Sequence, residues 1–136
     1  MTPPPAESIA FLMCEDARYE FSRRWSFMGV FGPTIQVPRV PSAIPGLCAA
    51  VLILNPRTPI QHVTATLENP HGKTMLRVEG GVETPFPEPP FLSHHILRAF
   101  PVLFDAEGEY RWTVGFNRDP EVGIEHKFRV RVGPPD

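Results

Sequence analysis

Two runs near the C-terminal end of the chain alternate apolar and polar residues with a period of two. The apolar positions of the first run are Tyr110, Trp112, Val114 and Phe116. Those of the second run are Ile124, His126, Phe128, Val130 and Val132. This period is typical of strands with one buried face. Because the turn-like residues 117–123 separate the runs, the pattern predicts an antiparallel hairpin, around which we expect the fold to be organised.

The alternation also suggests a register for this hairpin. Placing Trp112 opposite Phe128 gives both faces a consistent character and turns His126 toward the core beside Val114. On the other face the same register pairs Glu109 with Arg131, Arg111 with Arg129 and Thr113 with Lys127. A slip by one residue would move every apolar side chain to the solvent face.

Similar short patterns fill the rest of the chain. Strands are predicted at 9–14, 25–31, 35–37, 47–54, 61–68, 75–78 and 94–104, with residues 17–24 irregular or in a short helical turn. A helix remains an alternative for 47–54 because of its two alanines. With almost no helical periodicity, the profile indicates an all-β protein, an antiparallel immunoglobulin-like β-sandwich of seven to nine short strands. A β-barrel would give a similar pattern.

Size and proline distribution define the domain. A chain of 136 residues suits one domain that buries roughly two-thirds of its extended-chain surface. The 18 prolines avoid the predicted strands and collect between them, as their missing amide donor requires. We expect a flexible N-terminal tail at residues 1–7 and a single β-sandwich domain at residues 8–133.

Charge and hydropathy restrict the partners and the compartment. The net charge of -2 arises from scattered residues, so neither nucleic acid nor a membrane is an expected partner. No apolar run approaches the roughly 20 residues of a spanning helix, and no export signal is visible. We therefore expect a cytoplasmic protein in which Cys14 and Cys48 stay reduced, a disulfide between the two sheets being the alternative.

Two resemblances follow from particular residues. The segment from Asp105 to Tyr110 resembles the tyrosine corner of immunoglobulin-like domains, which implies a hydrogen bond from the tyrosine hydroxyl back to the backbone. The segments 11–16, 27–31 and 104–110 are similar to a family of short uncharacterised bacterial proteins catalogued as a domain of unknown function. That family has no assigned activity, so the resemblance implies no catalytic residues.

The residue types that carry chemistry form no recognisable motif. Glu15 and Asp16 could serve as paired carboxylates, but acids at a strand end are typical of solvated turns. His94 and His95 are adjacent and would point to opposite faces of a strand, so they cannot chelate one metal ion together. No nucleophile elbow, phosphate-binding glycine loop or Cys-x-x-Cys pair is present. We expect no catalytic residue, cofactor or metal.

Two surfaces are candidates for a partner. A proline-rich segment with two aromatic residues could form a polyproline helix; its candidate residues are Pro85, Phe86, Pro87, Pro89, Pro90 and Phe91. A stiff connector between strands is the simpler interpretation. The second surface is a basic stripe on the outward face of the C-terminal hairpin, made of Arg111, Lys127, Arg129 and Arg131. Such residues also guard sheet edges from aggregation.

The sequence thus favours a non-catalytic module that acts by protein–protein interaction or assembly, with a protein partner and a possible homo-oligomer through edge strands. Two alternatives belong to other classes. A small-ligand or carbohydrate-binding sandwich would expose aromatic side chains, whereas a hydrolase-type enzyme would use Glu15, Asp16 and a histidine.

Overall fold

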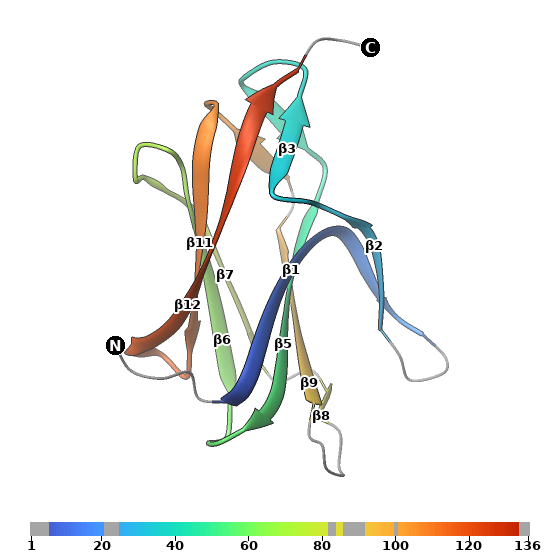
Figure 1. The fold of residues 1–136 in the computed structure, drawn as a ribbon, viewed down its shortest axis with the longest axis vertical. Coiled ribbons are helices and arrows are strands. Elements are labelled where there is room, and N and C mark those ends of the chain that lie inside the picture. Colours follow the sequence, from blue (N-terminus) through green and yellow to red (C-terminus); the bar gives the residue numbers. More distant parts are fainter. Residues whose placement is uncertain (1–5, 21–24, 82–83, 86–91, 100, 134–136) are drawn as a thin grey trace.

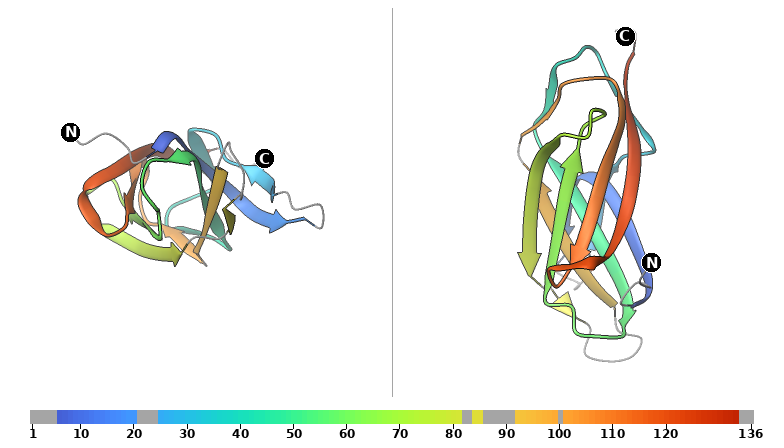
Figure 2. Two further views of the ribbon diagram at one scale, coloured as in Figure 1. Left: turned by 90° about the horizontal axis from the view of Figure 1, so that it is seen from below. Right: turned by 90° about the vertical axis from the view of Figure 1, so that its left-hand side faces the viewer.

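Two five-stranded sheets pack face to face in a computed structural model that describes residues 6–20, 25–81, 84–85, 92–99 and 101–133 (Figures 1 and 2). Sheet A has the strand order β2-β1-β5-β9-β8, and sheet B has the order β3-β12-β11-β6-β7. Sheet A contains β1 (Ala6–Tyr19), β2 (Trp25–Val30), β5 (Leu47–Pro56), β8 (Thr84–Pro85) and β9 (Leu92–Ala99). Sheet B contains β3 (Thr34–Val37), β6 (His62–Glu68), β7 (Thr74–Gly81), β11 (Gly108–Phe116) and β12 (Asp119–Val132). A separate two-stranded ribbon joins β4 (Ser42–Ile44) to β10 (Val102–Phe104).

The all-β sandwich of immunoglobulin-like type is confirmed. Nine of the twelve strands in the described residues have four or more residues, in line with the predicted seven to nine, and β4, β8 and β10 are shorter pieces. The segment 47–54 is a strand and not a helix. One pairing departs from the antiparallel prediction, because β3 runs parallel to β12, with Ile35 opposite Val130. Within the described residues no helix is long and apolar enough to cross a membrane.

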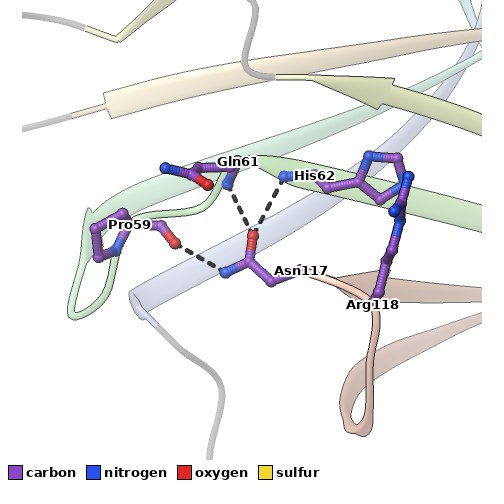
Figure 3. A pocket seen from close by; sticks show the side chains of 5 residues that line it. All are labelled: Pro59, Gln61, His62, Asn117 and Arg118. Atoms are coloured by element: carbon purple, nitrogen blue, oxygen red, sulfur yellow. Dashed lines mark hydrogen bonds between the residues drawn. The ribbon is translucent and has the colours of Figure 1, made fainter.

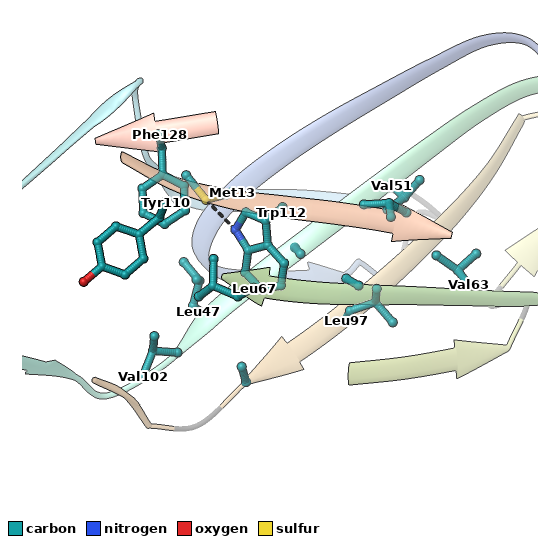
Figure 4. Close-up of a cluster of buried hydrophobic side chains, with 14 of the residues drawn as sticks. Met13, Leu47, Val51, Val63, Leu67, Leu97, Val102, Tyr110, Trp112 and Phe128 are labelled. Atoms are coloured by element: carbon teal, nitrogen blue, oxygen red, sulfur yellow. Dashed lines mark hydrogen bonds between the residues drawn. The ribbon is translucent and has the colours of Figure 1, made fainter. Parts of the chain in front are cut away.

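The interior between the sheets is filled by large side chains from alternate positions of both (Figure 4). Tyr110 and Trp112 of β11 are essentially inaccessible, as are Val51 and Ile53 of β5. Full burial of an aliphatic side chain such as Val51 or Ile53 contributes roughly 1.5–3 kcal/mol to the stability of the fold. The indole nitrogen of Trp112 donates a hydrogen bond of 3.1 Å to the Met13 sulfur across the interior. The inner-face positions that the alternation predicted are buried at Tyr110, Trp112, Val114, Phe116, Phe128 and Val130, whereas Ile124 and His126 are half-buried and Val132 is 40% exposed.

The predicted register of the C-terminal hairpin is wrong by two residues. Trp112 lies opposite His126, Tyr110 opposite Phe128, and Val114 opposite Ile124. Outward, Glu109 lies opposite Arg129, Arg111 opposite Lys127, and Thr113 opposite Glu125. A shift of two leaves each side chain on its expected face, so alternation alone cannot detect it. Phe128 remains in the same apolar cluster as Trp112.

The turn of this hairpin explains the shift. Instead of the long turn expected at 117–123, the chain reverses at two residues, Asn117 and Arg118, which have φ angles of 54° and 59°. Positive φ at both central positions is the type I′ geometry of tight hairpins. Phe116 then pairs with Asp119 while Gly115 pairs with Gly123, so that residues 120–122 form a bulge in β12. The bulge sets the register of all the pairs that follow.

The tyrosine corner has the hydrogen bond that the resemblance implied. The Tyr110 hydroxyl donates to the Ala106 carbonyl at 2.7 Å and accepts from the Ala106 amide at 3.3 Å. Tyr110 is fully buried, and burial raises the pKa of its hydroxyl. The bond therefore fixes the entry into β11 with the hydroxyl in its neutral, donating form.

Strand β1 continues beyond the predicted end at Glu15 and Asp16. Its residues Phe11 and Met13 face the interior, whereas the Ala17 carbonyl accepts a 2.7 Å bond from Arg98 of β9, which is two strands away. The far part of β1 and β2 therefore folds back over the outer face of sheet A (Figure 1). Trp25 and Phe27 cover a second apolar cluster there, of Cys14, Ala17, Cys48, Ala50 and Ile96. The predicted irregular segment 17–24 is thus strand up to Tyr19.

Cys14 and Cys48 lie directly opposite each other on β1 and β5. Both are fully buried and free, and both belong to sheet A, so the alternative of a disulfide between the two sheets does not apply. Burial raises the pKa of the Cys14 thiol to about 11 and also raises that of Cys48. The thiols are therefore neutral near pH 7 and unreactive.

The N-terminal boundary lies slightly earlier than expected. β1 begins at Ala6, whose side chain is buried and which pairs with Pro56. The predicted tail extended to residue 7, and its first five residues lie outside the described part.

Candidate ligand-binding site

The outer face of sheet B carries polar side chains that the strand alternation turns outward. β6 contributes Thr64 and Thr66, and β11 contributes Arg111 and Thr113. β12 contributes Glu125, Lys127, Arg129 and Arg131. This surface is called the B face below.

Ion pairs neutralise half of the predicted basic stripe. Arg111 contacts Glu68 at 2.9 Å and Glu125 at 3.6 Å, and Lys127 lies 3.9 Å from Glu109. Solvent screens these exposed pairs, so they contribute little to stability, but they occupy the charges. Arg129 and Arg131 make no ion pair or side-chain hydrogen bond with the described residues. The stripe is therefore two free guanidinium groups rather than a broad basic field.

A hollow of about 380 Å³ opens on the B face beside the hairpin turn. Its lining residues are Thr64, Thr66, Arg77, Thr113, Val114, Gly115, Arg118, Asp119, Val122 and Gly123. We call it the threonine hollow. Gly115 and Gly123 are paired across β11 and β12, and a Cβ atom at Gly115 would meet no other atom within 4 Å. A Cβ atom at Gly123 would come within 2.8 Å of the Val114 carbonyl oxygen, so of this pair Gly115 is the position that leaves open space.

A second hollow of about 610 Å³ adjoins the first at Arg118 and is lined by Pro59, Gln61, His62, Asn117 and Arg118 (Figure 3). Asn117 builds its wall. The side-chain oxygen of Asn117 accepts hydrogen bonds from the amides of Gln61 at 2.8 Å and His62 at 3.2 Å, and its nitrogen donates to the Pro59 carbonyl at 2.8 Å. The start of β6 and the hairpin turn are therefore held rigidly together.

Arg118 is common to both hollows and is in an unfavourable backbone conformation. Its φ of 59° belongs to the left-handed region, which costs a non-glycine residue roughly 1 kcal/mol. The preferred sequence for a type I′ turn is Asn-Gly, so glycine is the residue that the backbone favours here. Arg118 also makes no hydrogen bond or ion pair with any described residue. Its guanidinium is held over the site at a conformational cost and without a partner.

The remaining polar side chains of the threonine hollow differ in whether they have a hydrogen-bond or ion-pair partner. Arg77 is 3.0 Å from Glu79, which also lies 3.8 Å from His62. The Thr64 hydroxyl is buried and has no hydrogen-bond partner among the residues that the structure describes. A buried hydroxyl without a partner costs on the order of 1–3 kcal/mol. Arg118 and Thr64 are therefore the unsatisfied groups of the threonine hollow.

The proline-rich candidate falls mostly outside the described residues. Five of the six candidate residues lie outside the described part: Phe86, Pro87, Pro89, Pro90 and Phe91. The sixth, Pro85, belongs to β8, where its backbone lies opposite Ser93. The proposed contact through this segment stays a prediction.

Glu15 and Asp16 do not form a catalytic pair in the structure. Glu15 is exposed, and Asp16 accepts bonds from the Ala17 amide at 2.9 Å and from Arg18 at 3.1 Å. Neither residue lines the hollows described above. Both residues lie within β1, where Asp16 pairs with Met28 of β2, so the expectation of solvated turn residues at a strand end is wrong.

The histidines are dispersed. His94 and His95 point to opposite faces of β9, as expected: His94 lies beside Trp25 on the outer face of sheet A, whereas His95 is fully buried and within 3.3 Å of the Ser93 hydroxyl. His126 is half-buried against the Phe11 ring, with centroids 4.7 Å apart. Burial lowers the pKa of both His94 and His126. Among the described residues no three His, Cys, Asp or Glu side chains are grouped as metal ligands.

Sequence reasoning did not find the threonine hollow. Its lining residues come from four strands, β6, β7, β11 and β12, and the pairing of Gly115 with Gly123 depends on the bulge in β12. The available signals were Asn117, a residue that tolerates positive φ, and glycine inside a strand pattern, which often marks a bulge or a close approach. Neither of them points to Arg118.

Comparisons with known proteins give a family and a distant structural likeness. A protein-family model described as "Family of unknown function (DUF6941)" matches residues 9–132. No curated protein matches. Among solved structures, the chain is similar to the crystal structure of the CARDB domain of the PF1109 protein from Pyrococcus furiosus, solved in complex with di-metal ions. The identity is 13%, the TM-score is 0.42, and the match covers 97% of this chain and 95% of that one.

Proposed function

We propose a function for this chain, which belongs to the DUF6941 family of unknown function, from its own residues: it is a non-catalytic β-sandwich module that binds an acidic protein partner through the B face. One observation carries the proposal. Arg118, Arg129 and Arg131 on this face have no partner among the described residues, whereas Glu68, Glu79, Glu109 and Glu125 are all in ion pairs. A surface with free guanidinium groups and engaged carboxylates complements an acidic segment.

Arg131 lies in a recess separate from the two hollows at Arg118. Arg131 lines a hollow of about 490 Å³ with Thr34, Gln36, Val132 and Gly133, at the parallel pair of β3 and β12. Arg131 and Arg118 therefore stand in two separate recesses of one sheet face. An extended acidic segment could engage both, which would give the interaction a direction along the sheet.

The other classes of function find less support. A carbohydrate-binding sandwich needs aromatic rings exposed on one face; Tyr110 and Trp112 are buried, which speaks against it, whereas Trp25 is half-buried beside the exposed Tyr19. A hydrolase needs a base beside a nucleophile, and Glu15 and Asp16 lie apart from the hollows of the B face. Buried neutral thiols favour the reducing, cytoplasmic setting that we propose for the protein.

The test is capture of partners from a native lysate by immobilised protein, compared between variants. Charge reversal of Arg129 and Arg131 to Glu should abolish capture of a partner that the wild type retains, and added salt should weaken that capture. Arg18→Glu, an exposed arginine at the far end of β1 in sheet A, is the matched control. Equal capture by the wild type and the double variant would contradict a role for this face.

Self-association through an edge strand is a second candidate, favoured by β2. This strand forms one edge of sheet A, and Val30 at its end is 53% exposed. An open edge with an apolar residue is a template for pairing with a second copy of the chain. Light scattering should detect a dimer that Val30→Lys disrupts; a wild-type monomer at high concentration would remove this candidate.

A further inference from the structure

We propose that the threonine hollow binds a single carboxylate group carried by a polypeptide, such as a glutamate or aspartate side chain, with Arg118 as the main donor. The inference rests on the proposed function and deepens it, because it names the chemical group that the B face recognises and the position that receives it.

The first argument is the donor. A guanidinium presents a planar fork of N–H groups that matches the two oxygens of a carboxylate. Arg118 has no partner among the described residues, and it borders both the threonine hollow and the hollow beside His62 (Figure 3). Its fork is therefore available to a group that enters from solvent.

The second argument is the unsatisfied hydroxyl. Thr64 lines the same hollow as Arg118, and its buried hydroxyl has no partner among the described residues. Thr66 and Thr113 are paired neighbours on β6 and β11 and add two more hydroxyls. Hydroxyl groups can rotate to donate to an oxyanion, so the wall beside the guanidinium supplies the secondary hydrogen bonds that a carboxylate needs.

The third argument is shape. The floor of the hollow is the backbone of Gly115 and Gly123, and the space above Gly115 is open. A volume of about 380 Å³ is at the small end of ligand sites and admits one acidic side chain with part of its backbone. Since Gly115 does not have a positive φ, its lack of a side chain is not demanded by its backbone conformation.

The fourth argument concerns charge and selects a carboxylate over a phosphate. The lining contains Arg77 and Arg118 but also Asp119, and Arg77 is already paired with Glu79. A dianionic phosphate would be repelled by the nearby acids, whereas a monoanion needs only the one free arginine. No lysine lines the hollow.

The experiment is an NMR titration of ¹⁵N-labelled full-length protein with a blocked tetraglutamate peptide. The amides of 113–118 should shift with saturation, and the tetraglutamine peptide should leave them unchanged. Arg118→Gly should weaken binding at least about tenfold. Gly115→Val, whose Cβ atom would meet no other atom within 4 Å, should place a side chain in the hollow and weaken binding to the same extent. Arg18→Gln, on sheet A and outside the B face, is the matched control and should change the affinity less than about twofold.

The inference would be overturned if the tetraglutamate peptide shifted no amide, or if Arg118→Gly or Gly115→Val bound the peptide with wild-type affinity. It would also be overturned if inorganic phosphate bound more tightly than the peptide. Equal binding of free glutarate would overturn it too, because it would identify a small acid as the ligand. Thermal unfolding of both variants shows that loss of binding is not loss of fold. If Arg118→Gly still captures the lysate partner that the double charge reversal loses, this inference fails while the proposed function stands.

Discussion

The indole nitrogen of Trp112 on β11 donates a 3.1 Å hydrogen bond to the sulfur of Met13 on β1, and this bond joins the two sheets through the centre of the core. The two residues are 99 positions apart in the chain. Both are almost completely buried, so no water can replace either partner. The polar group of the tryptophan is thus satisfied by a weak acceptor rather than by a carbonyl.

Met13→Leu should therefore cost more than its volume suggests. A volume-conserving swap usually costs less than about 1.5 kcal/mol, but here the buried N–H loses its acceptor, which adds on the order of 1–2 kcal/mol. Urea unfolding of Met13→Leu, Trp112→Phe and the double variant measures the coupling between the two residues. Additive losses would show that the bond contributes nothing.

Tyr110→Phe should destabilise the domain by about 1–2 kcal/mol, because it removes the hydroxyl that bonds the Ala106 carbonyl and leaves that group without this partner. The ring and its contacts with Phe104 and Phe128 remain. Phe104→Leu, which alters packing but no hydrogen bond, is the comparison. A free energy of unfolding equal to that of the wild type would mean that the tyrosine corner is dispensable here.

Arg118→Gly should stabilise the protein by up to about 1 kcal/mol, because it creates the Asn-Gly turn that the φ angles of 54° and 59° require. Asn117→Ala should have the opposite effect, since it removes three hydrogen bonds to residues 59–62. Thermal melts of the two variants check both directions. A destabilised Arg118→Gly would show that the arginine is retained for the fold.

Stability should fall as the pH drops below the usual histidine range. Burial lowers the folded-state pKa of His126 and His94, so the unfolded chain binds more protons. The stabilisation is present above the unfolded value of about 6.5 and is lost as the pH falls below it. His126→Phe, which keeps a ring beside Phe11, should retain the stability at pH 8 and reduce the loss at pH 5. Denaturant midpoints at both pH values test this, and an unchanged pH dependence would contradict it.

Stability should also fall at high pH. The folded-state pKa of Cys14 is raised from 9.0 to about 11, so the stabilisation is complete below pH 9 and is lost as the pH rises toward 11. The same burial should block alkylation by iodoacetamide at pH 8 until urea unfolds the chain. Cys14→Ala separates this thiol from tyrosine and lysine titration. Rapid labelling of native protein would mean that the outer cluster of sheet A opens readily.

The faces of the strands could be predicted from the sequence because alternation reports burial directly. Tyr110, Trp112 and Phe128 were all placed on the inner face and lie in the core. The register of the hairpin could not be predicted in the same way, since a shift of two residues leaves each side chain on the same face of the sheet. What fixes it is a local event, the positive φ of Arg118 and the bulge that follows, and arginine gives no signal of that conformation.

The site was predictable only in part for the same reason. The basic stripe of Arg111, Lys127, Arg129 and Arg131 was expected to face outward, and it does. Which of these charges stay free depends on partners from other strands, such as Glu68 of β6 for Arg111. The threonine hollow depends on residues of four strands that meet beside a glycine pair, and no short segment of the sequence carries that information.

The parallel pairing of β3 with β12 has a consequence for synthesis of the chain. Sheet A is built wholly from residues 6–99, whereas in sheet B residues 34–37 pair with residues 129–132. On the ribosome sheet A can assemble while sheet B still lacks β12, the strand that joins β3 to the rest of the sheet. A nascent chain stalled before residue 119 would lack β12, which lies between β3 and β11, and would therefore present the unpaired edges of these two strands to chaperones.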